Sequence, residues 1–123
     1  MKVSKLLIAT IIILAGIIVY ALLKPSSGSS LSSSFAQCLS QNGVKMYGAY
    51  WCPHCQNQKT LFGDQFKYIQ YIECSLPDKG GQNDVCNKAE IQGYPTWEFK
   101  DGSRIQGEVT LGDLSQKTGC SLK

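Results

Sequence analysis

The sequence has little charge, a single histidine and no internal repeat. Charged residues are 17% of the 123, with 12 Lys+Arg against 9 Asp+Glu. Three lysines, Lys2, Lys5 and Lys24, flank an apolar run, so the other 9 basic residues balance the 9 acidic ones and the rest of the chain is neutral. A neutral domain has no basic surface for a phosphate backbone, which excludes a nucleic-acid-binding protein. The length excludes two full domains.

Residues 6–23, LLIATIIILAGIIVYALL, contain no charge. As a helix they would extend about 27 Å, close to the thickness of a bilayer's hydrocarbon core. We therefore predict a transmembrane signal anchor. Lys2 and Lys5 precede it and only Lys24 follows, so the positive-inside rule predicts that residues 1–5 are cytoplasmic and that the catalytic domain is extracytoplasmic. The alternative is a cleaved secretory signal peptide, although the run is long and lacks a small-x-small cleavage site. Under either interpretation, the domain is exported from the cytoplasm.

A serine-rich segment follows the apolar run. Residues 25–34, PSSGSSLSSS, hold seven serines and cannot bury enough apolar surface to order themselves. We predict a flexible linker at 24–34 with an average span of about 18 Å, and a folded domain at 35–123. Such a linker keeps the domain near the membrane, so its partners are expected in or near the same membrane.

Strand and helix patterns alternate through the domain. Ser34 to Gln37 has the form of a capping box, and Asp101-Gly102 is typical of a hairpin turn. The expected elements are a helix at 35–42, a strand at 44–50, a helix from the CxxC motif to about 62, strands at 68–74, 96–100 and 104–109, and helices at 84–91 and 111–118. Helical spacing puts three residues on one face with Cys55: Gln58, Leu61 and Phe62. We predict an α/β fold, a small mixed sheet of about four strands flanked by helices and preceded by one transmembrane helix.

The motif Cys52-Pro53-His54-Cys55 lies between an expected strand and an expected helix. Backbone N–H groups and the macrodipole at a helix N-terminus favour a thiolate, which makes Cys52 the predicted nucleophile. Pro53 suits the first helical position, where no N–H is needed. Cys55, one turn further on, is the predicted resolving thiol. His54 adds a dipolar or cationic neighbour for the thiolate. A stabilised thiolate stabilises the reduced form and makes the disulfide oxidising.

Three other interpretations of the motif remain open. Cys52, Cys55 and Cys74 are spaced like the first three ligands of a zinc ribbon, but no fourth ligand follows Cys74 at short spacing and the chain has no second histidine. The pair could instead form a purely structural disulfide, or belong to a redox-silent binding module. We predict neither a metal nor a cofactor.

The remaining four cysteines allow three pairings. Cys74 and Cys86 bracket a polar loop, so local closure is the simplest choice and would contribute roughly 3 kcal/mol. Cys38 and Cys120 would then join the two ends of the domain. The alternatives are a buried free thiol at Cys38 and an exposed one at Cys120.

The motif Trp51 to Cys55, with Tyr94-Pro95-Thr96 further along, resembles the thioredoxin superfamily. The resemblance implies a cis Pro95 that faces the CxxC motif and a Tyr94 that helps to set specificity. It also implies substrate contacts at Trp51, Tyr94 and Thr96. The dipeptide Pro53-His54 is the one found in DsbA-type periplasmic oxidants.

A longer similarity extends over residues 35–119. The runs MYGAYWCPHCQNQKTLFG, YIQYIEC and IQGYPTWEF, with the final helix, are similar to the thioredoxin-like domain fused to bacterial and plant vitamin K epoxide reductase homologues. The similarity implies a thiol–disulfide oxidoreductase that oxidises extracytoplasmic protein thiols. Because only one transmembrane segment is present, its reoxidant would be a membrane quinone reductase of that type in a separate chain. The alternatives are a tethered reductase and a zinc-stapled or redox-silent binding module.

One departure from ordinary thioredoxins concerns proton transfer. Thioredoxins carry a buried aspartate that assists the resolving cysteine, but no acid lies between Phe35 and Tyr50 here. The sequence leaves open which group, if any, accepts the Cys55 proton.

Overall fold

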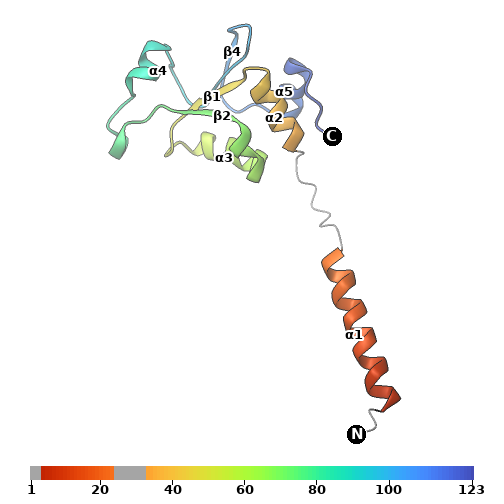
Figure 1. The fold of residues 1–123 in the computed structure, drawn as a ribbon. Helices are drawn as coiled ribbons and strands as arrows, with labels where there is room; N and C mark the ends of the chain where they lie inside the picture. The colour runs from red at the N-terminus through yellow and green to blue at the C-terminus, as the bar shows by residue number, and fades with distance from the viewer. Residues whose placement is uncertain (1–3, 24–32) are drawn as a thin grey trace.

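The computed structural model describes residues 4–23 and 33–123 (Figure 1). Helix α1 (Lys5–Leu23) has no buried residue. Within the described ranges it is the one helix that is long and apolar enough to cross a membrane. It matches the predicted span at 6–23 to within one residue. Positions 24–32 of the predicted linker at 24–34 lie outside the described residues.

Helix α2 (Ser33–Gln41) corrects the predicted boundary between linker and domain. Ser33 and Ser34 belong to the helix, so Ser34 is not its N-cap and the capping box is wrong. Phe35 and Ala36 are fully buried. One helical turn spans about 3.6 residues, so a helix that buries Phe35 and Ala36 includes the two preceding serines in its first turn.

A four-stranded mixed sheet forms the centre of the domain, as predicted. Its strands are β1 (Lys45–Gly48), β2 (Gln70–Glu73), β3 (Thr96–Glu98) and β4 (Arg104–Gln106), in the order β2-β1-β3-β4. β1 and β2 are parallel, and the other two pairs are antiparallel. Every strand is shorter than its predicted range, because each apolar run continues into a turn that leaves the sheet.

Helix α3 (Pro53–Phe62) follows β1. It ends at Gly63, whose φ of 52° lies in the left-handed region that glycine adopts without steric cost. A 3₁₀ segment, η1 (Gly63–Tyr68), comes next and was not predicted. It takes up Tyr68, which the sequence assigned to a strand. Within α3, Gln58 and Phe62 are buried with Cys55, but Leu61 is 47% exposed, so its predicted place on that face is wrong.

The two faces of the sheet have separate cores. On one face Met46 and Trp97 pack with α2, α3 and α5 (Leu111–Thr118). On the other, Tyr47 packs with Ile91, Cys74 and Cys86, the last of which belongs to α4 (Asp84–Lys88). A short 3₁₀ turn, η2 (Pro77–Lys79), precedes α4. Figure 1 shows α2 beside α5 on the first side and α4 projecting on its own.

Candidate active site

The CxxC motif begins helix α3 directly after the first strand. Cys52 is the N-cap, with an extended backbone (φ −77°, ψ 121°), and Pro53 is the first helical residue. The Cys52 N–H donates to Ala49 O at 3.0 Å, and the Cys52 carbonyl accepts from Gln56 N at 3.1 Å. The strand end and the helix start therefore hold Cys52 where the unpaired N–H groups of the first turn favour an anion.

The two motif cysteines are free thiols with different surroundings. Cys52 keeps 6% of its surface exposed, whereas Cys55 is fully buried. Burial and the neighbouring Cys52 together raise the pKa of Cys55 to about 12, against lowering effects of a backbone hydrogen bond at Ala49 and of Lys59. The burial and the raised pKa of Cys55 agree with a resolving role for it, and the exposed edge of Cys52 agrees with an attacking role.

The Tyr94–Pro95 peptide bond is cis and lies beside Cys52. The Cys52 thiol donates to Tyr94 O at 3.7 Å. The Trp51 ring meets the Tyr94 ring edge-on, with centroids 6.2 Å apart. Trp51 is 42% exposed. Trp51 and Tyr94 therefore form an aromatic wall next to the reactive sulfur.

Thr96 is buried, and its hydroxyl donates to Gly93 O at 2.8 Å across the turn that carries the cis proline. The substrate contact at Thr96 stays a prediction.

His54 pairs with an acid that the sequence did not single out. His54 Nδ1 lies 2.7 Å from Glu108 Oε1, and Asn57 Nδ2 donates to the same oxygen at 3.1 Å. These hydrogen bonds, that of His54 first, lower the pKa of Glu108. His54 therefore lies beside a carboxylate, and its effect on the Cys52 thiolate stays a prediction. Glu108 follows β4, and no pattern in the sequence links it to the motif.

Two disulfides join the other four cysteines: Cys38–Cys120 and Cys74–Cys86. These are the pairings favoured by the sequence, and neither Cys38 nor Cys120 is a free thiol. Because Cys74 is bonded to Cys86, it cannot supply the third sulfur of a zinc site.

The loop closed by Cys74–Cys86 supports the aromatic wall. Trp51 Nε1 donates to Ser75 Oγ at 2.8 Å. The Tyr94 hydroxyl donates to Gln82 Oε1. Ser75 and Gln82 face each other in an isolated antiparallel bridge. The second disulfide thus fixes the loop that holds both aromatic side chains beside Cys52.

A family model described as Thioredoxin matches residues 29–118. The chain belongs to the thioredoxin family. It is 42% identical over 102 residues to thiol-disulfide oxidoreductase LTO1 of Arabidopsis thaliana, covering 79% of this chain and 27% of that protein. It is 37% identical over 59 residues to protein disulfide isomerase-like 5-1 of Oryza sativa subsp. japonica, covering 45% of this chain and 40% of that protein. The chain therefore spans well under half of either relative.

Among solved structures, this thioredoxin-family chain is similar to chloroplastic thioredoxin z. The TM-score is 0.47 and the identity 19%, over 62% of this chain and 74% of that one.

A further residue of this thioredoxin domain, Tyr71, lies close to the buried Cys55. Its hydroxyl donates to Glu73 Oε2 at 2.8 Å. Glu73 Oε1 accepts from Tyr50 N at 3.2 Å and from Ser75 N at 2.9 Å. Lys59 Nζ lies 4.0 Å from the Tyr71 ring centroid. Alternate residues of a strand lie on the same face, so the spacing of Tyr71 and Glu73 along β2 could have indicated that these side chains lie together.

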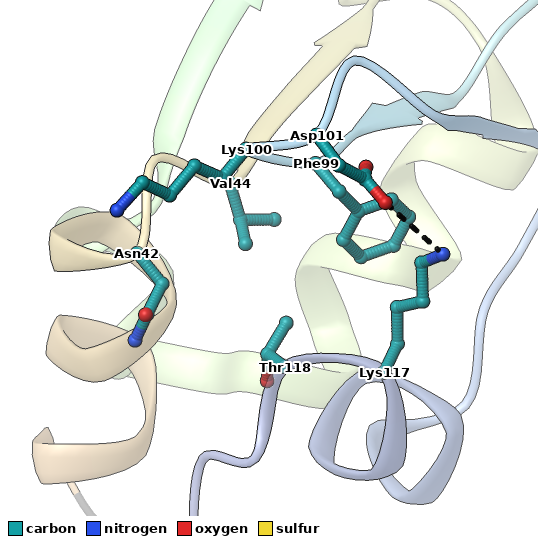
Figure 2. Close-up of a pocket in the computed structure, with 7 residues that line it drawn as sticks. All are labelled: Asn42, Val44, Phe99, Lys100, Asp101, Lys117 and Thr118. Carbon is teal, nitrogen blue, oxygen red and sulfur yellow. Dashed lines mark ion pairs between the residues drawn. The ribbon is translucent and has the colours of Figure 1, made fainter.

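A pocket of about 220 Å³ lies elsewhere on the domain (Figure 2). Figure 2 shows Asn42 at the end of α2 on one side and the Asp101–Lys117 ion pair, 3.8 Å long, on the other. The lining contains neither cysteine of the motif, so this pocket is separate from the candidate active site.

Proposed function

We propose that this chain is a thiol–disulfide oxidoreductase that oxidises protein thiols through a Cys52–Cys55 disulfide. One observation carries the proposal. The Cys52 thiol, at the start of α3, is 6% exposed and donates to Tyr94 O beside the cis proline, whereas Cys55 one turn behind it is fully buried. The arrangement separates an attacking sulfur from a resolving one.

The oxidising half-reaction begins with the Cys52–Cys55 disulfide. A substrate thiolate attacks Cys52 Sγ, a substrate–Cys52 bond forms, and Cys55 leaves and takes up a proton. A second substrate thiolate then attacks the substrate sulfur of this mixed disulfide and releases the Cys52 thiolate. The substrate loses two electrons and gains a disulfide, while the pair becomes a dithiol.

Reoxidation reverses the roles of the two cysteines. The Cys52 thiolate attacks a disulfide of the reoxidant and forms a second mixed disulfide. Cys55 then loses its proton and attacks Cys52 Sγ, which restores the Cys52–Cys55 bond and releases a thiolate of the reoxidant. We assign the reoxidant to the vitamin K epoxide reductase type of membrane quinone reductase, acting as a separate chain.

The oxidising direction is supported by the Pro53-His54 dipeptide and by the helix N-terminus that favours a Cys52 thiolate. Membrane attachment is supported by α1, whose apolar side chains are all exposed. With the domain outside the cytoplasm and α1 as anchor, substrate and reoxidant meet the enzyme at one membrane surface.

Trapping in living cells tests this function. Cys55→Ala leaves Cys52 without its resolving partner, so mixed disulfides should accumulate as adducts that disappear on reduction. Identification of the adducts should yield extracytoplasmic proteins with cysteine pairs and a polytopic quinone-reducing membrane protein. The matched control is Cys52→Ala/Cys55→Ala, which removes the attacking sulfur. Equal adducts in both variants, or none in either, contradict the proposal.

A further inference from the structure

Reoxidation requires that buried Cys55 lose its proton, and the structure shows which ionisable groups surround it. Burial raises the pKa of this thiol, so bulk water is a poor acceptor. The titratable groups that interact with it are Cys52 and Lys59 on α3, Tyr71 on β2 and Tyr94 in the cis-proline turn. Glu73 on β2 is the one carboxylate that acts on both of these tyrosines.

Cys55 and Tyr71 both lie against Gly48, where there is no room for a side chain. Gly48 and Glu73 are register partners, as are Met46 and Tyr71, so all four lie on one face of the sheet. A methyl group placed on the α-carbon of Gly48 would lie 2.9 Å from Cys55 Sγ and 3.2 Å from the Tyr71 hydroxyl oxygen. The sum of these distances limits the sulfur–oxygen separation to about 6 Å, which two hydrogen bonds through one water molecule can span.

The Tyr71 hydroxyl, which lies next to Gly48, is joined to Glu73. It donates to Glu73 Oε2 at 2.8 Å, and burial, with the adjacent Glu73, raises the pKa of Tyr71. Tyr71 therefore stays protonated and keeps pointing its proton at the carboxylate. The other oxygen of Glu73 is fixed by the backbone N–H groups of Tyr50 and Ser75.

We propose that Glu73 accepts the proton of Cys55 through the Tyr71 hydroxyl when Cys55 attacks the mixed disulfide at Cys52. The Cys55 thiol proton moves by way of one water to the Tyr71 oxygen, while the Tyr71 proton moves to Glu73. The new bond joins Cys55 Sγ to Cys52 Sγ, and the bond between Cys52 and the reoxidant's sulfur breaks and leaves a thiolate. Tyr71 ends as it began. This assignment rests on the proposed function, because it describes its reoxidation half-reaction.

The test uses the full chain in detergent with the Cys52–Cys55 pair reduced. A chromogenic aromatic disulfide, 5,5′-dithiobis(2-nitrobenzoate), serves as the reoxidant. Attack by Cys52 releases one coloured thiolate in a first phase that depends on reagent concentration. Attack by Cys55 releases a second thiolate in a later phase that does not. Both phases are followed by stopped-flow absorbance as a function of pH.

Glu73→Gln is the central variant. The glutamine carbonyl can still accept from Tyr50 N and Ser75 N, so the shape is retained while the basic oxygen is lost. At neutral pH the second phase should slow about 100-fold, the lower end of general-base effects, with the first phase unchanged. The wild-type rate should vary little near neutrality, whereas the variant's rate should rise about tenfold per pH unit as hydroxide replaces the base.

Tyr71→Phe keeps the ring and removes the relay, so its second phase should slow in the same way, with the same pH slope. The matched control, Glu90→Gln, removes an exposed carboxylate after α4 and should leave both phases unchanged. A wild-type second phase and pH profile in either Glu73→Gln or Tyr71→Phe overturns the relay. Absence of a Cys52-dependent first phase in the wild type instead overturns the proposed function.

Discussion

Gln58 is the one fully buried polar side chain on α3, and its replacement should measurably destabilise the domain. Its Oε1 accepts from Val109 N at 2.7 Å and from Trp97 Nε1 at 3.3 Å. Its Nε2 donates to Val109 O at 2.9 Å. One amide therefore connects the catalytic helix to β3 and to the segment that precedes α5.

Gln58→Leu retains most of the volume and removes all three hydrogen bonds. The N–H and C=O of Val109 and the indole N–H of Trp97 would then lie unpaired in the core, each at a cost of about 1–3 kcal/mol. The additional apolar burial of leucine returns about 1–2 kcal/mol. With three such groups, the expected net loss in the free energy of unfolding is about 4–5 kcal/mol.

Urea unfolding of the full chain in detergent, followed by tryptophan fluorescence, measures this loss. Gln56→Leu is the matched control, because Gln56 is exposed on the same helix and makes a single side-chain hydrogen bond, to Tyr50 O. The control should change the free energy of unfolding by less than about 1 kcal/mol. A Gln58→Leu variant as stable as the wild type would refute the idea that these bonds are net stabilising.

The two disulfides should differ in their contribution to stability. Cys38–Cys120 has a sequence separation of 82, so its double alanine variant should lose about 4.5 kcal/mol by loop-closure entropy, against about 2.8 kcal/mol for the separation of 12 at Cys74–Cys86; urea midpoints in the reverse order would contradict this. Burial raises the pKa of Glu98, but hydrogen bonds from Arg104 and Lys45 outweigh this effect and hold the pKa below its ordinary value. The ion pairs therefore stabilise the fold above the unfolded pKa of about 4.3, and that contribution is lost as pH falls through the folded pKa. As the pH is lowered from 7, the free energy of unfolding should fall less steeply for Glu98→Gln than for the wild type. An equally steep fall would argue against this role.

Features set by local sequence could be predicted. The order of elements follows from hydrophobic periods and turn residues, and the placement of Cys52 at a helix start follows from the strand, Pro53 and the helical pattern after it. The two disulfide pairings agree with chain order, because Cys74 and Cys86 bracket one loop. The shared motif residues also implied the cis bond before Pro95.

Features set by tertiary contact could not be predicted. The buried stripe of α3 runs through Cys55, Gln58 and Phe62, and helical spacing alone did not show that Leu61 falls beside it. Glu108 reaches His54 only because the segment after β4 passes the start of α3.

No acid lies between Phe35 and Tyr50 to accept the Cys55 proton, and only the register of the sheet points to Glu73 instead. Parallel pairing of β1 with β2 puts Glu73 beside Gly48, and hence near Cys55. Nothing in the sequence fixes that register.

The reduction potential of the Cys52–Cys55 pair decides whether this chain oxidises or reduces protein thiols. The full chain is equilibrated with glutathione buffers of defined ratio, and the reduced fraction is measured by alkylation and mass spectrometry. An oxidising pair should have a potential well above the value of about −270 mV for thioredoxin, towards the value of about −120 mV for a strong thiol oxidant. A potential at or below about −270 mV would contradict it and identify the chain as a tethered reductase.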